Sequence, residues 1–190
     1  MIIQATPYGT KKEEPFAFTY SGDFTDERVD GIGDVTLNTS GQLVTTGKTV
    51  TVSVYILGAG GGAAYNSYRR AASGGGGGNQ TVEVTLEPGT YEIIIGTGGA
   101  AVSAQYDKAT GGSGGNTTAF GKTSTGGTGG FVNYSGGSPS YTGGSGGSPN
   151  GSAGTTGTSN NASGGSPNGG AVISGVARNG GNGLVRITFS

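Results

Sequence analysis

The chain has 190 residues, of which 45 are glycine, and it carries a formal net charge of −1 with only 31% hydrophobic residues. This length suits one domain, and charged residues are scarcer than in most disordered chains. The sequence contains no histidine and no cysteine, which excludes disulfides, thiolate chemistry and the commonest general base. We therefore expect a protein that is not an enzyme and needs no cofactor.

The chain is expected to begin with an arm over residues 1–15 that docks the protein to a partner. Met1–Gln4 is apolar enough for an edge strand, and residues 6–15 are polar with a proline near each end. The start lacks the positive region and apolar run of a signal peptide. No apolar stretch reaches the length of about 18 residues that a membrane span needs.

Residue alternation predicts the first strands. Phe16–Tyr20 alternates aromatic with small or polar residues, and the acidic stretch Ser21–Asp34 that follows is predicted to be a loop. Val35–Leu37 and Gln42–Thr45 flank the turn sequence Asn38–Gly41, so these two strands are expected to form a hairpin.

The strongest strands border the glycine-rich regions. Lys48–Leu57 alternates valine or isoleucine with polar residues. Gln80–Leu86 and Tyr91–Ile95 flank a Pro-Gly turn and are expected to pair as an antiparallel hairpin. Gly183–Phe189 is predicted to close the chain as a last strand.

These strands predict an all-β fold, a small antiparallel β-sandwich within a single domain. Its strands come from residues 16–57, 80–95 and 183–190. A first glycine-rich segment, residues 58–79, and a second, residues 96–182, interrupt them as long excursions that begin and end at the sandwich.

The glycine-rich segments could be flexible loops or an ordered bundle of polyglycine II-like helices. Such helices have three residues per turn, and only glycine lets their backbones approach closely enough to hydrogen-bond. The sequence GGSPNG occurs at Gly146–Gly151 and at Gly164–Gly169, 18 residues apart, as a three-residue turn allows. Polar turns between the rods are predicted at Pro139, Pro149, Asn150, Pro167 and Asn168.

The order of the motifs resembles the glycine-rich domain of bacteriophage tail-fibre and minor tail proteins. A strand ends in a glycine block at Val50–Gly62, and a glycine–strand–Pro-Gly–strand–glycine unit covers Gly74–Gly99. GGNTTAFG at Gly114–Gly121 and GNGLVRITF at Gly181–Phe189 complete the pattern. The resemblance covers roughly residues 16–190.

The resemblance implies a virion protein of the tail tip or fibre, made in the bacterial cytoplasm and extracellular after lysis. It implies that exposed turns of a glycine-rich bundle bind a bacterial surface glycan or outer-surface protein. The expected partners include other virion proteins and further copies of this chain. The alternative is a non-adhesive, self-assembling subunit or decoration protein of the tail or capsid.

Aromatic and basic residues in the glycine-rich segments are the candidates for receptor contact, because they are rigid or can stack on sugars. They are Tyr65, Tyr68, Arg69, Arg70, Tyr106, Phe131, Tyr134 and Tyr141. The competing interpretation is that Tyr134 and Tyr141 pack on the bundle and that the arginines lie at an exposed loop tip. Phe120 is expected to be structural.

Other sites are less well supported. The acidic residues Asp23, Asp26, Glu27, Asp30 and Asp34 lack the spacing of a calcium loop, which favours a solvated loop over a Ca²⁺ or carboxylate site. The stretch Gly58–Gly62 precedes no helix pattern, which argues against nucleotide binding. Three basic residues between Gly111 and Ser190 are too few for a nucleic-acid surface. Threonines lack the fixed period of an ice-binding array.

Overall fold

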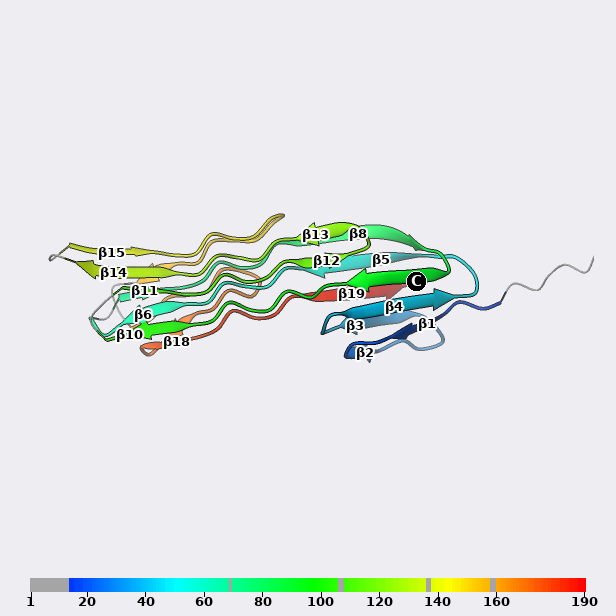
Figure 1. Ribbon diagram of the computed structural model, residues 1–190, viewed down its shortest axis with the longest axis horizontal. Coiled ribbons are helices and arrows are strands. Elements are labelled where there is room, and N and C mark those ends of the chain that lie inside the picture. The colour runs from blue at the N-terminus through cyan, green and yellow to red at the C-terminus, as the bar shows by residue number, and fades with distance from the viewer. Residues whose placement is uncertain (1–13, 69, 106–107, 136–137, 158–159) are drawn as a thin grey trace, which may run out of the picture.

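The computed structural model describes residues 14–68, 70–105, 108–135, 138–157 and 160–190. Figure 1 shows an elongated molecule with a β-sandwich at one end, a tip of short strands at the other, and extended glycine-rich runs between them. The predicted all-β class is confirmed. Among the described residues there is no helix long and apolar enough to cross a membrane.

Two antiparallel sheets form the sandwich. One has the strand order β1 (Ala17–Tyr20), β4 (Gly41–Thr46), β9 (Gly89–Ile93), and the other β2 (Phe24–Asp26), β3 (Gly33–Leu37), β19 (Leu184–Phe189), β5 (Val50–Leu57), β8 (Asn79–Leu86). Alternation in β5 buries Val52, Val54 and Ile56 as the sequence predicts. The closing strand is also confirmed, since β19 lies between β3 and β5.

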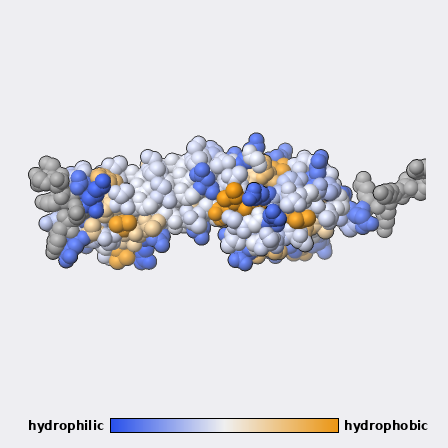
Figure 2. Space-filling model, in the orientation of Figure 1, coloured by the Kyte–Doolittle hydropathy of each residue, from blue (hydrophilic) through white to orange (hydrophobic). Residues whose placement is uncertain are grey.

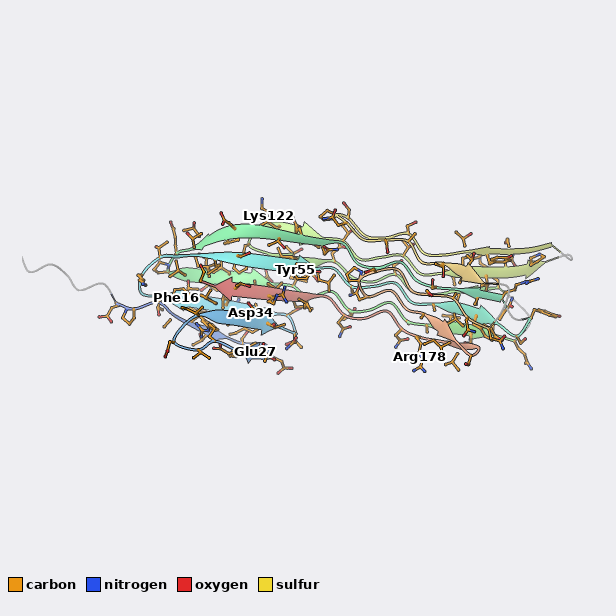
Figure 3. All side chains as sticks on the ribbon, turned by 180° about the vertical axis from the view of Figure 1, so that it is seen from behind. Phe16, Glu27, Asp34, Tyr55, Lys122 and Arg178 are labelled. Atoms are coloured by element: carbon orange, nitrogen blue, oxygen red, sulfur yellow. The ribbon has the colours of Figure 1, made fainter. Side chains whose placement is uncertain are left out.

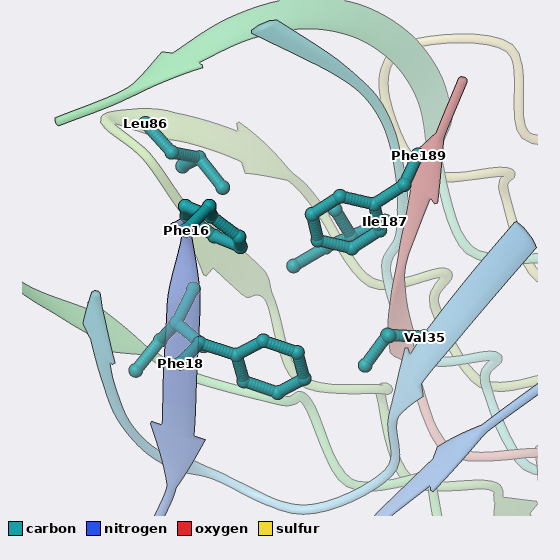
Figure 4. Close-up of a pocket in the computed structure, with 7 residues that line it drawn as sticks. Phe16, Phe18, Val35, Leu86, Ile187 and Phe189 are labelled. Atoms are coloured by element: carbon teal, nitrogen blue, oxygen red, sulfur yellow. The ribbon is translucent and has the colours of Figure 1, made fainter. Parts of the chain in front are cut away.

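Apolar side chains fill the space between the two sheets (Figure 4). Phe16 and Phe18, from the start of the described chain, pack beside Ile187 and Phe189 from the last strand. The gap that these side chains line has no room for a water molecule. It is therefore core packing and not a ligand cavity.

Both hairpins predicted from the sequence are wrong. Strands β3 and β4 belong to different sheets, and so do β8 and β9. Strand β8 instead pairs along its whole length with β5, from Val50 opposite Leu86 to Leu57 opposite Asn79. The Asn38–Gly41 turn therefore leads from β3 in one sheet to β4 in the other, and the Pro-Gly turn leads from β8 to β9 in the same way.

The acidic stretch Ser21–Asp34 is not simply a loop. It contains β2, which pairs with β3, and a bridge between Val29 and Ile32. The alternation is weak because every residue of β2 is exposed, so the strand carries no apolar pattern for the sequence to reveal.

Ten extended runs connect the sandwich with the tip or fold back beside it. Numbered in chain order as rods 1 to 10, they are residues 58–63, 73–78, 96–101, 111–116, 125–130, 143–148, 151–155, 163–166, 168–171 and 178–183. At about 3.1 Å per residue, a rod of six residues is roughly 19 Å long. Rods 1 to 5 and rod 10 run directly between the strands of the two ends.

Rod 1 shows the three-residue turn in its hydrogen bonds. The N–H groups of Gly58 and Gly61 donate to rod 2, those of Ala59 and Gly62 to rod 4, and those of Gly60 and Ala63 to rod 10. Its carbonyl groups accept from rods 3, 5 and 9. Rod 1 therefore has six hydrogen-bonded neighbours, as in a hexagonal lattice of polyglycine II helices.

Rod 2 has the same arrangement. It donates to rods 5, 7 and 9 and accepts from rods 1, 6 and 8. The other eight rods are hydrogen-bonded in a closed ring, in the order 3, 4, 5, 6, 7, 8, 9, 10 and back to 3. The ordered bundle is thus what the structure contains, and it consists of two central rods inside a complete shell.

Several outer rods follow a Gly-Gly-x pattern, as in Gly111–Asn116 and Gly143–Ser148. Their glycines face neighbouring rods, and x is a small polar residue that accepts a hydrogen bond from an adjacent outer rod. Thr128 Oγ1 accepts from Ser145 N at 2.7 Å, and Asn182 Oδ1 accepts from Gly98 N at 2.9 Å. These side chains satisfy N–H groups that have no other backbone partner.

One stretch of the second glycine-rich segment returns to the sandwich. Strands β12 (Thr117–Ala119) and β13 (Lys122–Ser124) form a hairpin whose turn residues, Phe120 and Gly121, both have positive φ. Phe120 packs edge-on against Tyr91 with ring centroids 5.4 Å apart. The expectation that Phe120 is structural is confirmed.

Candidate binding site at the tip

The tip is built from three small sheets at the far ends of the rods (Figure 1). Their strands are β6 (Ala64–Asn66), β7 (Arg70–Ala72), β10 (Val102–Ala104) and β16 (Thr156–Gly157) in the first, β11 (Ala109–Thr110), β14 (Phe131–Ser135) and β15 (Ser138–Thr142) in the second, and β17 (Val172–Ile173) and β18 (Val176–Ala177) in the third. Segments far apart in the sequence therefore meet there.

Strand β6 separates two apolar clusters, because its successive side chains point to opposite faces. Tyr65 packs against the cluster that contains Val172, and its hydroxyl donates to Asn160 Oδ1 at 3.1 Å. Ala64 belongs to the other cluster, with Val132. Tyr65 is thus half-buried, and it connects β6 with the part of the tip that contains the third sheet.

Two cation–π contacts lie on the side of the second sheet. The Arg70 guanidinium lies 5.6 Å from the ring centre of Tyr141, and Lys108 Nζ lies 5.3 Å from that of Phe131. Such contacts contribute about 0.5–1 kcal/mol each where they are exposed. They place two positive charges on aromatic side chains of the second sheet, Arg70 from the first sheet and Lys108 from the residue before β11.

Asn66 is the residue of the tip that the sequence reasoning missed. It is 0% exposed, and neither atom of its side-chain amide has a hydrogen-bond partner among the residues that the structure describes; the same holds for Arg70 Nε. Asn66 and Arg70 are opposite each other on the paired strands β6 and β7. A single asparagine in a glycine-rich sequence gives no signal for this position.

The predicted contact residues gather at the tip as far as the structure describes them. Tyr65, Tyr68, Arg70, Phe131 and Tyr141 all lie there, and Tyr68 is 45% exposed. Tyr134 lies in β14, opposite Pro139, and its side chain is outside the described part of the chain. Arg69 and Tyr106 also lie outside the described residues.

The predicted turn residues have different locations. Pro149 and Asn150 join rods 6 and 7. The equivalent Pro167 joins rods 8 and 9 and Asn168 begins rod 9, so the GGSPNG repeats reverse the chain twice. Pro139 is not in a turn between rods, because it lies within β15. It is tolerated there because β15 is an edge strand, where a missing N–H costs no ladder hydrogen bond.

The acidic residues Asp23–Asp34 lie on the sandwich, away from the tip (Figure 3). Asp26 forms an ion pair with Arg28 at 2.6 Å, and the hydrogen bond from Arg28 lowers the pKa of the Asp26 carboxyl. Asp34 accepts from Thr188 Oγ1 at 2.7 Å. Among the described residues, no group of three or more His, Cys, Asp or Glu residues could hold a metal ion.

Charge is divided unevenly along the molecule. The two glycine-rich segments contain five basic residues and one acid, a net charge of +4, whereas the remaining residues contain five basic and ten acidic residues, a net charge of −5. Among the described basic residues of these segments, Arg70, Lys108 and Arg178 lie at or beside the tip and Lys122 lies on the sandwich, whereas the described acidic residues lie on the sandwich (Figure 3).

Exposed apolar side chains also occur on the tip. Ile173 and Val176 are each 53% exposed in the β17–β18 hairpin, and Val102 is 37% exposed. Figure 2 shows apolar residues gathered at this end of the molecule, over β10 and β18. Basic, aromatic and apolar groups therefore lie together on one end.

The family model of the glycine-rich domain matches residues 38–190, from the start of β4 to the end of the chain. The chain belongs to this family. No curated protein matches the chain. The part of this glycine-rich domain that the model matches contains all ten rods and the whole tip, and it excludes β1, β2 and β3.

Proposed function

We propose that this glycine-rich domain is a binding module whose tip contacts a receptor on the bacterial surface, as part of a bacteriophage tail tip or fibre. The observation that carries the proposal is the gathering of Tyr68, Arg70, Phe131 and Tyr141 at one end, on two hairpins, β6–β7 and β14–β15, that are far apart in the sequence. The phage assignment follows from the resemblance of the motif order.

The rods support this assignment because they hold the tip at a fixed distance from the sandwich. The sandwich and the tip lie at opposite ends of the molecule, so an attachment to other virion proteins at the sandwich leaves the tip free. Positive charge toward the tip favours approach to an anionic cell surface by that end. Binding and not catalysis is proposed because the sequence has no histidine or cysteine.

Binding of the purified, fluorescently labelled protein to whole bacterial cells tests the proposal. The tip variants Ile173→Ser and Val176→Ser are compared with Val29→Ser and Ile32→Ser, which change side chains that are 75% and 62% exposed on the sandwich. We expect the tip variants to lower cell binding at least about tenfold and the sandwich variants to leave it unchanged. Equal binding of all four variants and the unmodified chain would contradict a receptor site at this face of the tip.

A self-assembling virion subunit is the second candidate function. The exposed Phe24, Val29 and Ile32 favour it, because they form apolar surface on the sandwich. Sedimentation velocity separates the two functions. Oligomers that dissociate in Val29→Ser and Ile32→Ser, together with no binding to cells, would support the subunit.

A further inference from the structure

The unpaired atoms of Asn66 and Arg70 need an explanation. Buried polar atoms in folded proteins are nearly always hydrogen-bonded, and each exception destabilises the fold. Three such atoms without a partner in the described part of the chain, Asn66 Nδ2, Asn66 Oδ1 and Arg70 Nε, lie on neighbouring strands. An apolar residue of similar size at position 66 would avoid the cost, which points to a ligand for these atoms.

Strand geometry places the three atoms on one face. Asn66 shares the face of Ala64, since alternate residues point the same way, and Ala64 belongs to the cluster that includes Val132. Cross-strand partners also share a face, so Arg70 lies on this side with Asn66. The contact between Arg70 and the Tyr141 ring confirms its direction.

The chemistry of these atoms defines the ligand. Arg70 Nε and Asn66 Nδ2 are donors that suit an oxyanion, and Asn66 Oδ1 is an acceptor that needs a hydroxyl or N–H donor. A half-buried aromatic ring, Tyr141, borders the pair. One molecule that offers an anionic acceptor, a neighbouring hydroxyl donor and a ring face is a carboxylated sugar.

We propose that Asn66, Arg70 and Tyr141 form a binding site for the carboxylate and an adjacent hydroxyl of an acidic surface sugar. The carboxylate accepts from Arg70 and Asn66, and the hydroxyl donates to Asn66 Oδ1. This inference rests on the proposed function in taking the tip as the recognition surface. Because Asn66 is fully covered, binding requires a local opening of the tip, and association is slower than for a preformed site.

The test uses the full chain and hexuronic-acid oligosaccharides as the probe, with calorimetric titration and thermal unfolding. Three arms are compared: the acidic oligosaccharide, its carboxyl-reduced neutral counterpart and inorganic phosphate. We expect binding of the acidic sugar only, with a shift of the Asn66 side-chain amide resonances in NMR spectra. Equal binding of the neutral sugar, or tighter binding of phosphate, would overturn the assignment to a sugar carboxylate.

Two variants separate a ligand site from a structural role. Asn66→Leu removes the unpaired amide at similar size, so we expect Tm to rise by several degrees while sugar binding falls at least about tenfold. Arg70→Lys retains the charge but loses Nε, and we expect a similar loss of binding with Tm unchanged. A fall in Tm for Asn66→Leu would show that the amide has structural partners, which would overturn the proposal.

Failure of this inference differs from failure of the proposed function. If the unmodified chain binds whole cells but none of the three probes, the receptor site at the tip stands and the carboxylated-sugar site falls. If it binds the acidic oligosaccharide but no cells, the site stands and the adhesive function falls.

Discussion

Gly61 shows what the rods demand of a single residue. Its N–H donates to Gly75 O at 2.8 Å, its C=O accepts from Gly170 N at 2.8 Å, and a Cβ built on it would overlap with the carbonyl oxygen of Thr128. Backbone fills all three directions around this residue. A side chain therefore has to displace a neighbouring rod.

We expect Gly61→Ala to destabilise the fold by about 1–3 kcal/mol, because overpacking against backbone forces the lattice apart. Thermal unfolding measures the change. Gly89→Ala is the matched control, since the nearest atom to its Cβ is 3.9 Å away. The control is expected to be neutral or slightly stabilising, because alanine restricts the unfolded chain. Equal stability of the two variants would contradict a tightly packed rod.

Asn168 and Asn150 occupy the same place in the two GGSPNG repeats but have different surroundings. Asn168 Nδ2 donates to the carbonyl oxygens of Gly58, Gly181 and Asn182 at 2.9–3.2 Å, and its Oδ1 accepts from Gly77 N at 2.9 Å. Asn150 Nδ2 donates once, to Asn79 O at 3.1 Å. The Asn168 side-chain amide thus bonds to the backbone of rods 1, 2 and 10, as a peptide group of the lattice does.

Asn168→Asp turns these donors into an acceptor that faces carbonyl oxygens. We expect a loss of about 1–3 kcal/mol in the free energy of unfolding, measured by chemical denaturation, and a smaller loss for Asn150→Asp. If both variants lose the same amount, the side chain of Asn168 has no special place in the bundle.

At the scale of single residues, the sequence identified aromatic and basic residues, because these types are unusual in a glycine-rich segment. Tyr68, Arg70 and Tyr141 stand out in a glycine-rich segment, and they do lie at the tip. Asn66 was missed and Asn168 was predicted only as a turn residue, because asparagine is common in turns and the surroundings of both residues come from distant parts of the chain.

The rods are the elements that carry the molecule's order. Each of the two central rods is surrounded by backbone on all sides, whereas outer rods expose one residue in three. In hydrogen exchange, we expect the amides of Gly60–Gly62 and Gly74–Gly77 to be the slowest of the glycine-rich segments. Complete exchange of these amides within the dead time would show that the bundle does not form in solution.

Arg28 joins the first and last strands of the sandwich. Its guanidinium lies 4.7 Å from the ring centre of Phe18 and 4.9 Å from that of Phe189, and it pairs with Asp26. The pKa of Asp26 is lowered below its ordinary value of 3.8. Its ion pair therefore adds stability above that pH, and the contribution is lost as the pH falls through the lowered value.

Asp26→Asn should make the fall of Tm between pH 5 and pH 2 shallower than in the unmodified chain, by a small amount because the pair is largely exposed. Asp23→Asn is the control, since the Asp23 side chain forms no ion pair in the described chain. An unchanged pH profile in Asp26→Asn would show that the pair contributes nothing.

At the level of elements, the positions of most sandwich strands were predictable, whereas strand partners, β2 and the short strands of the glycine-rich segments were not. The alternation in β5, β8 and β19 reflects one buried face, which the sequence states directly. Pairing depends on which strand edges are free in each sheet of the sandwich. A turn sequence such as Pro-Gly can connect strands of two different sheets as well as the two strands of a hairpin. The Gly-Gly-x pattern of the outer rods is a sequence signal for the bundle. The two GGSPNG repeats alone only suggested the bundle.

For the whole molecule, the sequence predicted a sandwich with glycine-rich rods that begin and end on it, but neither the strands at the far end of the rods nor how the rods close on each other. Eight rods form a ring around the two central rods. Which rods become neighbours depends on hydrogen bonds between distant parts of the chain, and the sequence does not state these. Each tip strand is joined directly to a rod, β6 and β7 to the central rods 1 and 2 and the others to rods of the ring. We therefore expect sequence changes in the loops of the tip to leave the positions of the rods unchanged.

The bundle has a further consequence for the thermal behaviour of the protein. Its interior is made of peptide groups, so unfolding it exposes polar surface, which lowers the heat capacity, and little apolar surface, which raises it. We expect the heat-capacity change of unfolding to fall below the roughly 12–15 cal/mol/K per residue of ordinary domains. Differential scanning calorimetry measures it, and a value within that range would contradict a backbone-packed interior. A smaller heat-capacity change flattens the dependence of stability on temperature, so this protein should resist unfolding in the cold better than a domain of equal size with an apolar core.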